Sequence, residues 1–229
     1  MGRSELFGRC LAGTVTLAIV FSLIPSLAGA QALRFQPQGV AAAGQGNAFA
    51  AQADDPSAIH YNPAALSRLD GVQTSFGISL MGGSIRATNQ SGVGTHGDFG
   101  GALVFPPPGH TYITANIGAL GAPRFSAVTI GVGLNTPFGL KTEYPVSGPF
   151  NTATTSAALP LIAIKPTIAY KITEDLSLGV SADIYTFASF LGEGHAEQRQ
   201  VSAGGLGIPA GASVELNGRG TGAGVTVSA

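Results

Sequence analysis

The sequence predicts an all-β fold, a transmembrane antiparallel β-barrel of which about six strands are present. Only 10% of the residues are charged, whereas roughly 25% are charged in a typical soluble protein. Beyond the N-terminus, no apolar run is long enough for a membrane-spanning helix. Several segments alternate apolar with small or polar residues. Strands of this kind can cross a bilayer, because they satisfy one another's backbone hydrogen bonds.

The composition also limits the possible partners and chemistry. The net charge is -1 and lysine and arginine form no cluster, which excludes a polybasic nucleic-acid-binding protein. Cys10 is the single cysteine, so it cannot form an internal disulfide. The histidines are scattered, with no cysteine or carboxylate at the spacing of metal ligands, and no phosphate-binding loop occurs. We therefore expect no enzyme, no cofactor and no metal site.

The first thirty residues have the order of a secretory signal peptide. Arg3 and Arg9 precede an apolar run over residues 11–24, which Pro25 ends. The run is too short to span a bilayer, and the small residues 28–30 suit a signal peptidase. We expect cleavage after Ala30 and export of the remainder. An N-terminal anchor helix is the alternative interpretation.

Residues 31–70 differ from everything that follows, because they show helix and turn signals and little strand pattern. The stretch 41–51 is rich in small residues whose glycines permit close packing. Residues 54–57 (Asp-Asp-Pro-Ser) indicate a turn or a helix start. Residues 62–66 (Asn-Pro-Ala-Ala-Leu) predict a second turn that leads into a short helix. The segment therefore reads as a compact plug before the strand region, residues 71–229.

From Val72 onward the periodicity is two, and each run is roughly 9–11 residues long, enough for a tilted strand to cross a bilayer. The predicted strands are 72–80, 110–119, 126–135, 161–171, 176–187 and a sixth that begins near Val214. The connections 121–124 and 173–175 are short, while 81–109, 136–160 and 188–212 are long and rich in Gly, Pro, Ser and Thr. This alternation is typical of short periplasmic turns and long extracellular loops.

A soluble β-sandwich also alternates, and it is the alternative fold. A sandwich normally presents charged residues to water on its outer face. Here the second face of the strands is mostly Gly, Ser and Thr, which suits a narrow or tightly filled lumen better.

Three stretches resemble the FadL-type outer-membrane transporters of long-chain fatty acids and aromatic hydrocarbons. Residues 44–66 are similar to the N-terminal hatch of that family with its Asn-Pro-Ala motif. Residues 131–144 are similar to the passage from the third strand into a loop, and residues 165–179 to the hairpin that follows. The resemblance implies a small helical hatch inside the barrel lumen. Members are much longer and have more strands, so we expect this chain to be the N-terminal part of such a protein.

The resemblance implies passive transport of a hydrophobic compound through a plugged barrel in the bacterial outer membrane, with a long-chain fatty acid as the expected substrate. The ligand would be captured near the extracellular loops and would leave when the hatch moves or through a lateral opening. Aromatic hydrocarbons are the other substrate class. We expect contact with outer-membrane lipid and a monomeric barrel at full length. A structural or adhesive barrel and a secreted β-sandwich binding module are the alternative functions.

Two groups of residues are candidates for this function. The candidate hatch and gating residues are Asp54, Asp55, Asn62, Pro63 and Ala64. The candidate ligand path comprises Phe35, Phe49, Phe138, Lys165 and Arg219. The structural alternatives are a helix start for the first group and aromatic packing for Phe35 and Phe49. By strand parity, five charged side chains should face the lumen, where they could pair and anchor the plug: Lys165, Lys171, Asp183, Glu215 and Arg219.

Overall fold

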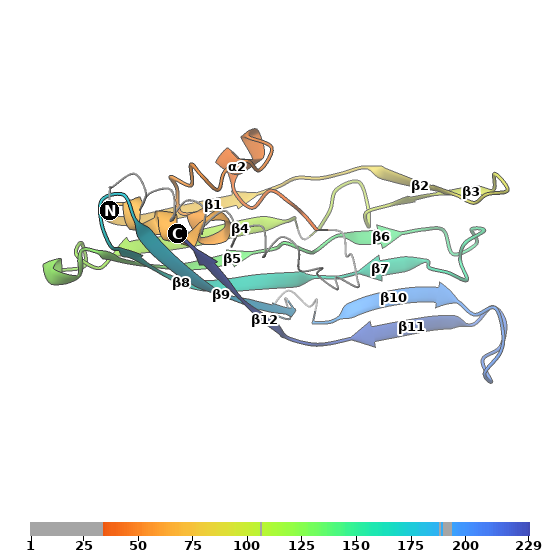
Figure 1. Ribbon diagram of the computed structural model, residues 1–229. Coiled ribbons are helices and arrows are strands. Elements are labelled where there is room, and N and C mark those ends of the chain that lie inside the picture. The colour runs from red at the N-terminus through yellow and green to blue at the C-terminus, as the bar shows by residue number, and fades with distance from the viewer. Residues whose placement is uncertain (1–33, 106, 188, 190–193) are drawn as a thin grey trace, which may run out of the picture. The chain divides into compact units, whose positions relative to one another are not determined.

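The computed structural model describes residues 34–105, 107–187, 189 and 194–229 (Figure 1). The predicted signal peptide, residues 1–30, lies outside the described residues. Among the described residues, no helix has both the length and the apolar character needed to span a membrane.

Short helices precede the first strand. They are α2 (Val40–Gly44), α3 (Ala58–Tyr61) and the 3-10 helix η1 (Pro63–Arg68). The helix α2 ends because Gly46 and Asn47 adopt positive φ angles of 61° and 68°, a conformation that these residue types tolerate after a helix. Pro63 starts η1, where its fixed φ angle and missing N–H are compatible with a first helical turn. Residues 34–70, the described part of the segment that the resemblance predicts to be a hatch, are called the hatch below.

A six-stranded antiparallel sheet follows the hatch in the order β1-β4-β5-β8-β9-β12. Its strands are β1 (Val72–Ile78), β4 (Gly109–Asn116), β5 (Val128–Asn135), β8 (Leu161–Lys171), β9 (Ser177–Phe187) and β12 (Gly222–Ser228). The five strands predicted before residue 188 are confirmed. The sheet is open, with β1 and β12 at its edges.

A strand begins near Val214 as predicted, but it is interrupted after Gly218. The strand beside β9 is β12, whereas β11 (Ser213–Gly218) pairs with β10 (Ala196–Val201). Residues 219–221 separate the two strands and belong to neither. The glycines at 218, 220 and 222 carry no side chain to pack in a continuous strand, so a break is inexpensive here.

The long connections also differ from the loops that were predicted. Each contains a hairpin, namely β2 (Ser84–Thr88) with β3 (Gly94–Asp98), β6 (Lys141–Glu143) with β7 (Ser156–Ala158), and β10 with β11. Neighbouring hairpins pair to form a second sheet, β11-β10-β7-β6-β3-β2. Local composition could not predict it, because the partner of each hairpin comes from a distant connection. The short turn after β4 contains the 3-10 helix η2 (Pro123–Phe125).

The two faces of the first sheet differ in the way that the alternation predicted. Large apolar side chains on one face are exposed, for example Phe76 (73%) and Val132 (52%). The opposite face is small or polar. The register aligns one row of it across all six strands: Gln73, Thr114, Gly131, Thr167, Ser181 and Thr226. An apolar face toward lipid and a polar lumen are typical of a transmembrane barrel.

Candidate functional site: the contact between hatch and barrel wall

The hatch packs its core against the inner face of the first sheet. Phe49, Ile59 and Leu66 are completely buried, in a cluster that also contains Tyr112 of β4 and Ala169 of β8. The ring of Phe49 meets that of Tyr61 edge to face, with centroids 5.6 Å apart. In this conformation Phe49, a candidate for the ligand path, has no exposed surface toward the lumen. Phe49 therefore packs inside the hatch, which was the alternative to a place on the ligand path.

Three glycines of the barrel wall let the hatch approach closely. A Cβ atom added at Gly179 of β9 would lie 2.1 Å from the Ala64 backbone nitrogen. Added Cβ atoms at Gly131 and Gly133 of β5 would lie 2.8 and 2.9 Å from side-chain carbons of Ile59. At Gly179 the added Cβ would meet hatch backbone, so only glycine fits there, whereas at Gly131 and Gly133 the side chain of Ile59 would have to shift. The hatch therefore rests on backbone that carries no side chains.

The Asn62-Pro63-Ala64 motif lies at this contact. The backbone N–H of Ala64 donates a hydrogen bond to the Ser228 hydroxyl of β12 (2.8 Å). One turn later, the hydroxyls of Ser67 and Ser177, the first residue of β9, lie 2.7 Å apart. Both polar contacts link η1 to the wall next to Gly179. The motif therefore docks through its backbone and small side chains.

The side chain of Asn62 joins two parts of the hatch. Its Nδ2 donates to the backbone oxygen of Ala50 (2.9 Å). Its buried Oδ1 has no hydrogen-bond partner among the described residues. Asp55 accepts a hydrogen bond from the Ser57 N–H (2.7 Å) and shapes the turn before α3. Asp54 is exposed and accepts one from Gln52 (3.0 Å).

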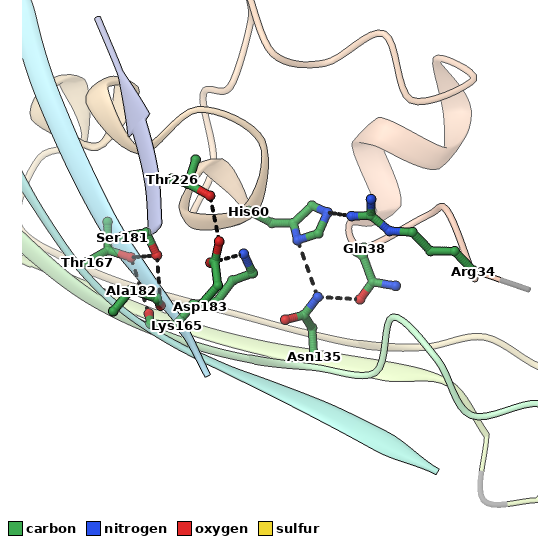
Figure 2. Close-up of polar contacts among 10 residues, drawn as sticks. All are labelled: Arg34, Gln38, His60, Asn135, Lys165, Thr167, Ser181, Ala182, Asp183 and Thr226. Atoms are coloured by element: carbon green, nitrogen blue, oxygen red, sulfur yellow. Dashed lines mark hydrogen bonds and ion pairs between the residues drawn. The ribbon is translucent and has the colours of Figure 1, made fainter. Parts of the chain in front are cut away.

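The start of the hatch is held by Gln38, which is only 1% exposed. The Tyr112 hydroxyl donates to the Gln38 backbone oxygen (2.8 Å). Asn135 Nδ2 donates to Gln38 Oε1 (2.8 Å), as Figure 2 shows. Next to it, the N–H of Phe35 donates to the backbone oxygen of Pro137 (2.8 Å). These bonds attach the segment before α2 to the end of β5. Phe35, a ligand-path candidate, is itself half-buried.

His60 of α3 lies between two hydrogen-bond donors. Its Nε2 is 3.3 Å from Arg34 Nη2, and its Nδ1 is 3.3 Å from Asn135 Nδ2 (Figure 2). Burial, together with the positive charges of Lys165 and Arg34, lowers the pKa of His60 from 6.5 to about 3. The ring is therefore neutral at neutral pH. A neutral imidazole accepts at one nitrogen only, so it cannot serve both donors at once.

A buried ion pair joins two strands of the wall. Lys165 Nζ of β8 contacts Asp183 Oδ1 of β9, and the Thr226 hydroxyl of β12 donates to Asp183 Oδ2 (2.7 Å) (Figure 2). The side chains of Lys165 and Asp183 are 4% and 11% exposed. Beside them the Thr167 hydroxyl donates to that of Ser181 (2.9 Å). Lys165 is therefore neutralised by Asp183 in this conformation.

Parity also assigned Lys171, Glu215 and Arg219 to the lumen. Lys171 lines a cavity together with Asn62 and Ala64 of the hatch, and it pairs with Glu174 at the turn after β8 (2.6 Å). Glu215 belongs to the second sheet, and Arg219 lies in the break between β11 and β12.

Arg219 lines a cavity of about 370 Å³. The other lining residues among those described are Leu161, Tyr185, Phe187, Gly218, Gly220, Thr221 and Gly222. The ring of Tyr185, which lines the cavity, lies 6.4 Å from that of Phe138 between centroids. Two candidates for the ligand path, Phe138 and Arg219, are thus brought to one place. A larger cavity, about 680 Å³, lies against the hatch at Asn62, Ala64 and Arg68.

Comparison with known proteins identifies the family. A family model described as outer membrane protein transport protein (OMPP1/FadL/TodX) matches residues 21–226. The chain belongs to this family. The resemblance carried by the hatch and strand motifs is thereby confirmed, and so are the β-barrel class and the outer-membrane location.

Individual relatives are longer than this chain. A curated protein of Neisseria meningitidis serogroup B is 35% identical over 121 residues, which cover 50% of this chain and 24% of that protein. Outer membrane protein P1 of Haemophilus influenzae is 30% identical over 176 residues, 71% of this chain and 38% of its own. A solved Pseudomonas aeruginosa FadL homologue matches with 16% identity and a TM-score of 0.48, over 88% of this chain and 50% of its own. The chain therefore spans half or less of the length of these relatives.

Several residues at the contact between the hatch and the barrel wall were not among the candidate site residues from the sequence. Gly179, Gln38 and Asn135 were missed because no spacing rule links the hatch to β5 or β9. The small residues on the inner face of the strands were the available signal for the wall glycines. They indicated a tightly filled interior, although not which glycine meets which part of the hatch.

Proposed function

We propose that the full-length protein carries hydrophobic compounds passively across the outer membrane, and that long-chain fatty acids are its main substrates. Family membership supports transport in general. The observation that favours a fatty acid is the cavity in which Arg219 accompanies the apolar side chains of Leu161 and Phe187. Such a site offers an apolar surface for an acyl chain and a cation for its carboxylate.

The chemistry of the cavity distinguishes fatty acids from aromatic hydrocarbons. Burial of the tail contributes about 0.8 kcal/mol per CH₂ group, and this contribution is open to both substrate classes. A hydrocarbon such as toluene has no group to pair with a guanidinium, whereas a carboxylate forms charge-assisted hydrogen bonds with it. The arginine therefore favours an acid over a hydrocarbon. Phe138 would extend the apolar surface through its contact with Tyr185.

The hatch acts as the gate in this proposal. With the hatch docked, Pro63 and Ala64 lie against the wall at Gly179, and Gln38 holds the preceding segment. Passage of a solute would require these contacts to open. Asn62 and Asp55 would preserve the internal shape of the hatch during this movement, through their bonds to Ala50 and Ser57.

The exposed apolar face of the first sheet supports a further part of the proposal. Side chains such as Phe76 and Val132 would contact outer-membrane lipid. The second sheet, which is built from the long connections, would then project on the extracellular side. We propose a monomeric barrel for the full-length protein.

Uptake of labelled oleate tests the transport proposal. The full-length gene is expressed in a bacterial strain that lacks its own fatty-acid channel, with barrel assembly monitored by heat-modifiable migration on gels. Arg219→Gln should lower oleate uptake but leave toluene entry unchanged. The matched control is Arg124→Gln, since Arg124 lies in the short η2 turn, away from the residues that line the cavity.

Each outcome has a defined meaning. Parent uptake no greater than that of the empty vector would reject fatty-acid transport and favour a structural or adhesive barrel. Equal uptake by the parent and Arg219→Gln would remove the cavity from the substrate path.

A further inference from the structure

The hairpin of β10 and β11 brings together an imidazole and two carboxylates. His195 immediately precedes β10 and Glu197 is the second residue of that strand, and their side chains lie 3.8 Å apart at the nearest atoms. Glu215 comes from β11, opposite Arg199 in the register. One ligand atom from each of His195, Glu197 and Glu215 lies within 4.8 Å of the others. The spacing of the histidines in the sequence did not reveal this group, because its third member comes from another strand.

Arg199 partly neutralises this group. Its Nε lies 2.7 Å from Glu197 Oε1 and 3.4 Å from Glu215 Oε2. The other oxygen of Glu197 faces His195, with Oε2 3.8 Å from Nε2. The side chain of Arg199 is 50% exposed and can turn away into solvent. Two carboxylates and one guanidinium leave a net negative charge, which attracts a cation.

Two neighbouring side chains bear on this group. Asn217 Nδ2 donates a hydrogen bond to Glu215 Oε1 (2.9 Å), which orients this carboxylate. Ser156 of β7 is opposite Arg199 in the register, on the same face of the sheet. Its buried hydroxyl has no hydrogen-bond partner among the described residues. A water molecule held by a metal ion in this group could supply one.

We propose that His195, Glu197 and Glu215 bind a zinc-class divalent ion on the second sheet, in competition with Arg199. Imidazole nitrogen and carboxylate oxygen together are typical zinc ligands, whereas calcium and magnesium prefer oxygen alone. Three protein ligands leave room for water at the metal. This site is separate from the hatch and does not depend on the transport proposal.

Zinc binding to the full-length protein in detergent tests the proposal. Bound zinc is measured by equilibrium dialysis against zinc alone, with calcium as a competitor in a second series. His195→Gln and Glu197→Gln should each weaken binding by at least about tenfold, because each removes a ligand. Arg199→Gln should bind zinc at least as tightly as the parent, since the competing cation is gone. The control is His96→Gln, an exposed histidine of β3 in the same sheet.

The variant series separates a metal site from an ion-pair cluster. Zinc affinity equal to the parent in both His195→Gln and Glu197→Gln would overturn the proposal. Loss of zinc in Arg199→Gln, in a barrel that migrates normally on gels, would overturn it as well. Displacement of zinc by an equal concentration of calcium would contradict the assigned class of ion.

Discussion

Replacing Gly179 by alanine should loosen the hatch without disturbing the barrel wall. The new Cβ would lie 2.1 Å from Ala64 N and 2.3 Å from the carbonyl carbon of Pro63, whereas ordinary contacts begin at 3.4 Å. The hatch backbone must therefore move by 3.4 − 2.1 = 1.3 Å. Such overpacking typically costs about 1–3 kcal/mol. A cost of about 2 kcal/mol would increase the undocked population roughly 30-fold.

Hydrogen exchange of the full-length protein in detergent measures this population. The Ala64 N–H, which bonds to Ser228, reports docking directly, and exchange through local opening follows the population of the open state. Exchange across η1 should quicken roughly 30-fold in Gly179→Ala. The control is Gly224→Ala, because a Cβ at that position of β12 would lie 3.8 Å from the Cβ of Asp183, an ordinary contact.

One outcome would refute this prediction. If Gly179→Ala assembles normally and its η1 amides exchange at the rate of the parent, the close approach of the hatch to β9 does not hold the hatch in place. Faster exchange in Gly224→Ala to the same extent would show a general effect of added side chains in the lumen.

Three further predictions concern other contacts of the hatch and the wall. Because burial lowers the pKa of His60 from 6.5 to about 3, its contribution to docking is complete above pH 6.5 and is lost as the pH falls toward 3. The rate of proteolysis of the hatch should thus rise by up to about tenfold for each pH unit by which the pH falls in this window. His60→Gln should weaken this pH dependence. The same pH dependence in His60→Gln as in the parent would contradict the role of His60. Lys165→Met should lower the free energy of unfolding in urea by about 3–5 kcal/mol, because Asp183 stays buried without its partner. The double variant Lys165→Met/Asp183→Leu should recover most of that loss, and failure to do so would assign the pair a role beyond charge neutralisation. Phe49→Ala should lower the free energy of unfolding of the hatch by about 3–5 kcal/mol. A protease should then cleave faster before residue 70, while the barrel still shows heat-modifiable migration on gels. Cleavage at the rate of the parent would show that the Phe49 cluster does not hold the hatch together.

The sequence determined the barrel class, because the physical signal is local. Alternation with period two follows from the pleat of a single strand, so the segments around β1, β4, β5, β8 and β9 could be predicted without knowing their partners. The low proportion of charged residues and the small residues on the inner face of the strands can likewise be read from the sequence alone. The turn residues of the hatch, including Asp55 and Pro63, indicated its helix starts for the same local reason.

Only the tertiary structure decided what those elements meet. Pairing between hairpins of distant connections created the second sheet and placed Glu215 opposite Arg199 in it. The close contact of Ala64 with Gly179 and the grouping of His195 with Glu215 depend on register between strands far apart in the chain. A local pattern fixes which way a side chain points from its strand. It does not fix which strand or helix lies opposite, because that is set by long-range packing.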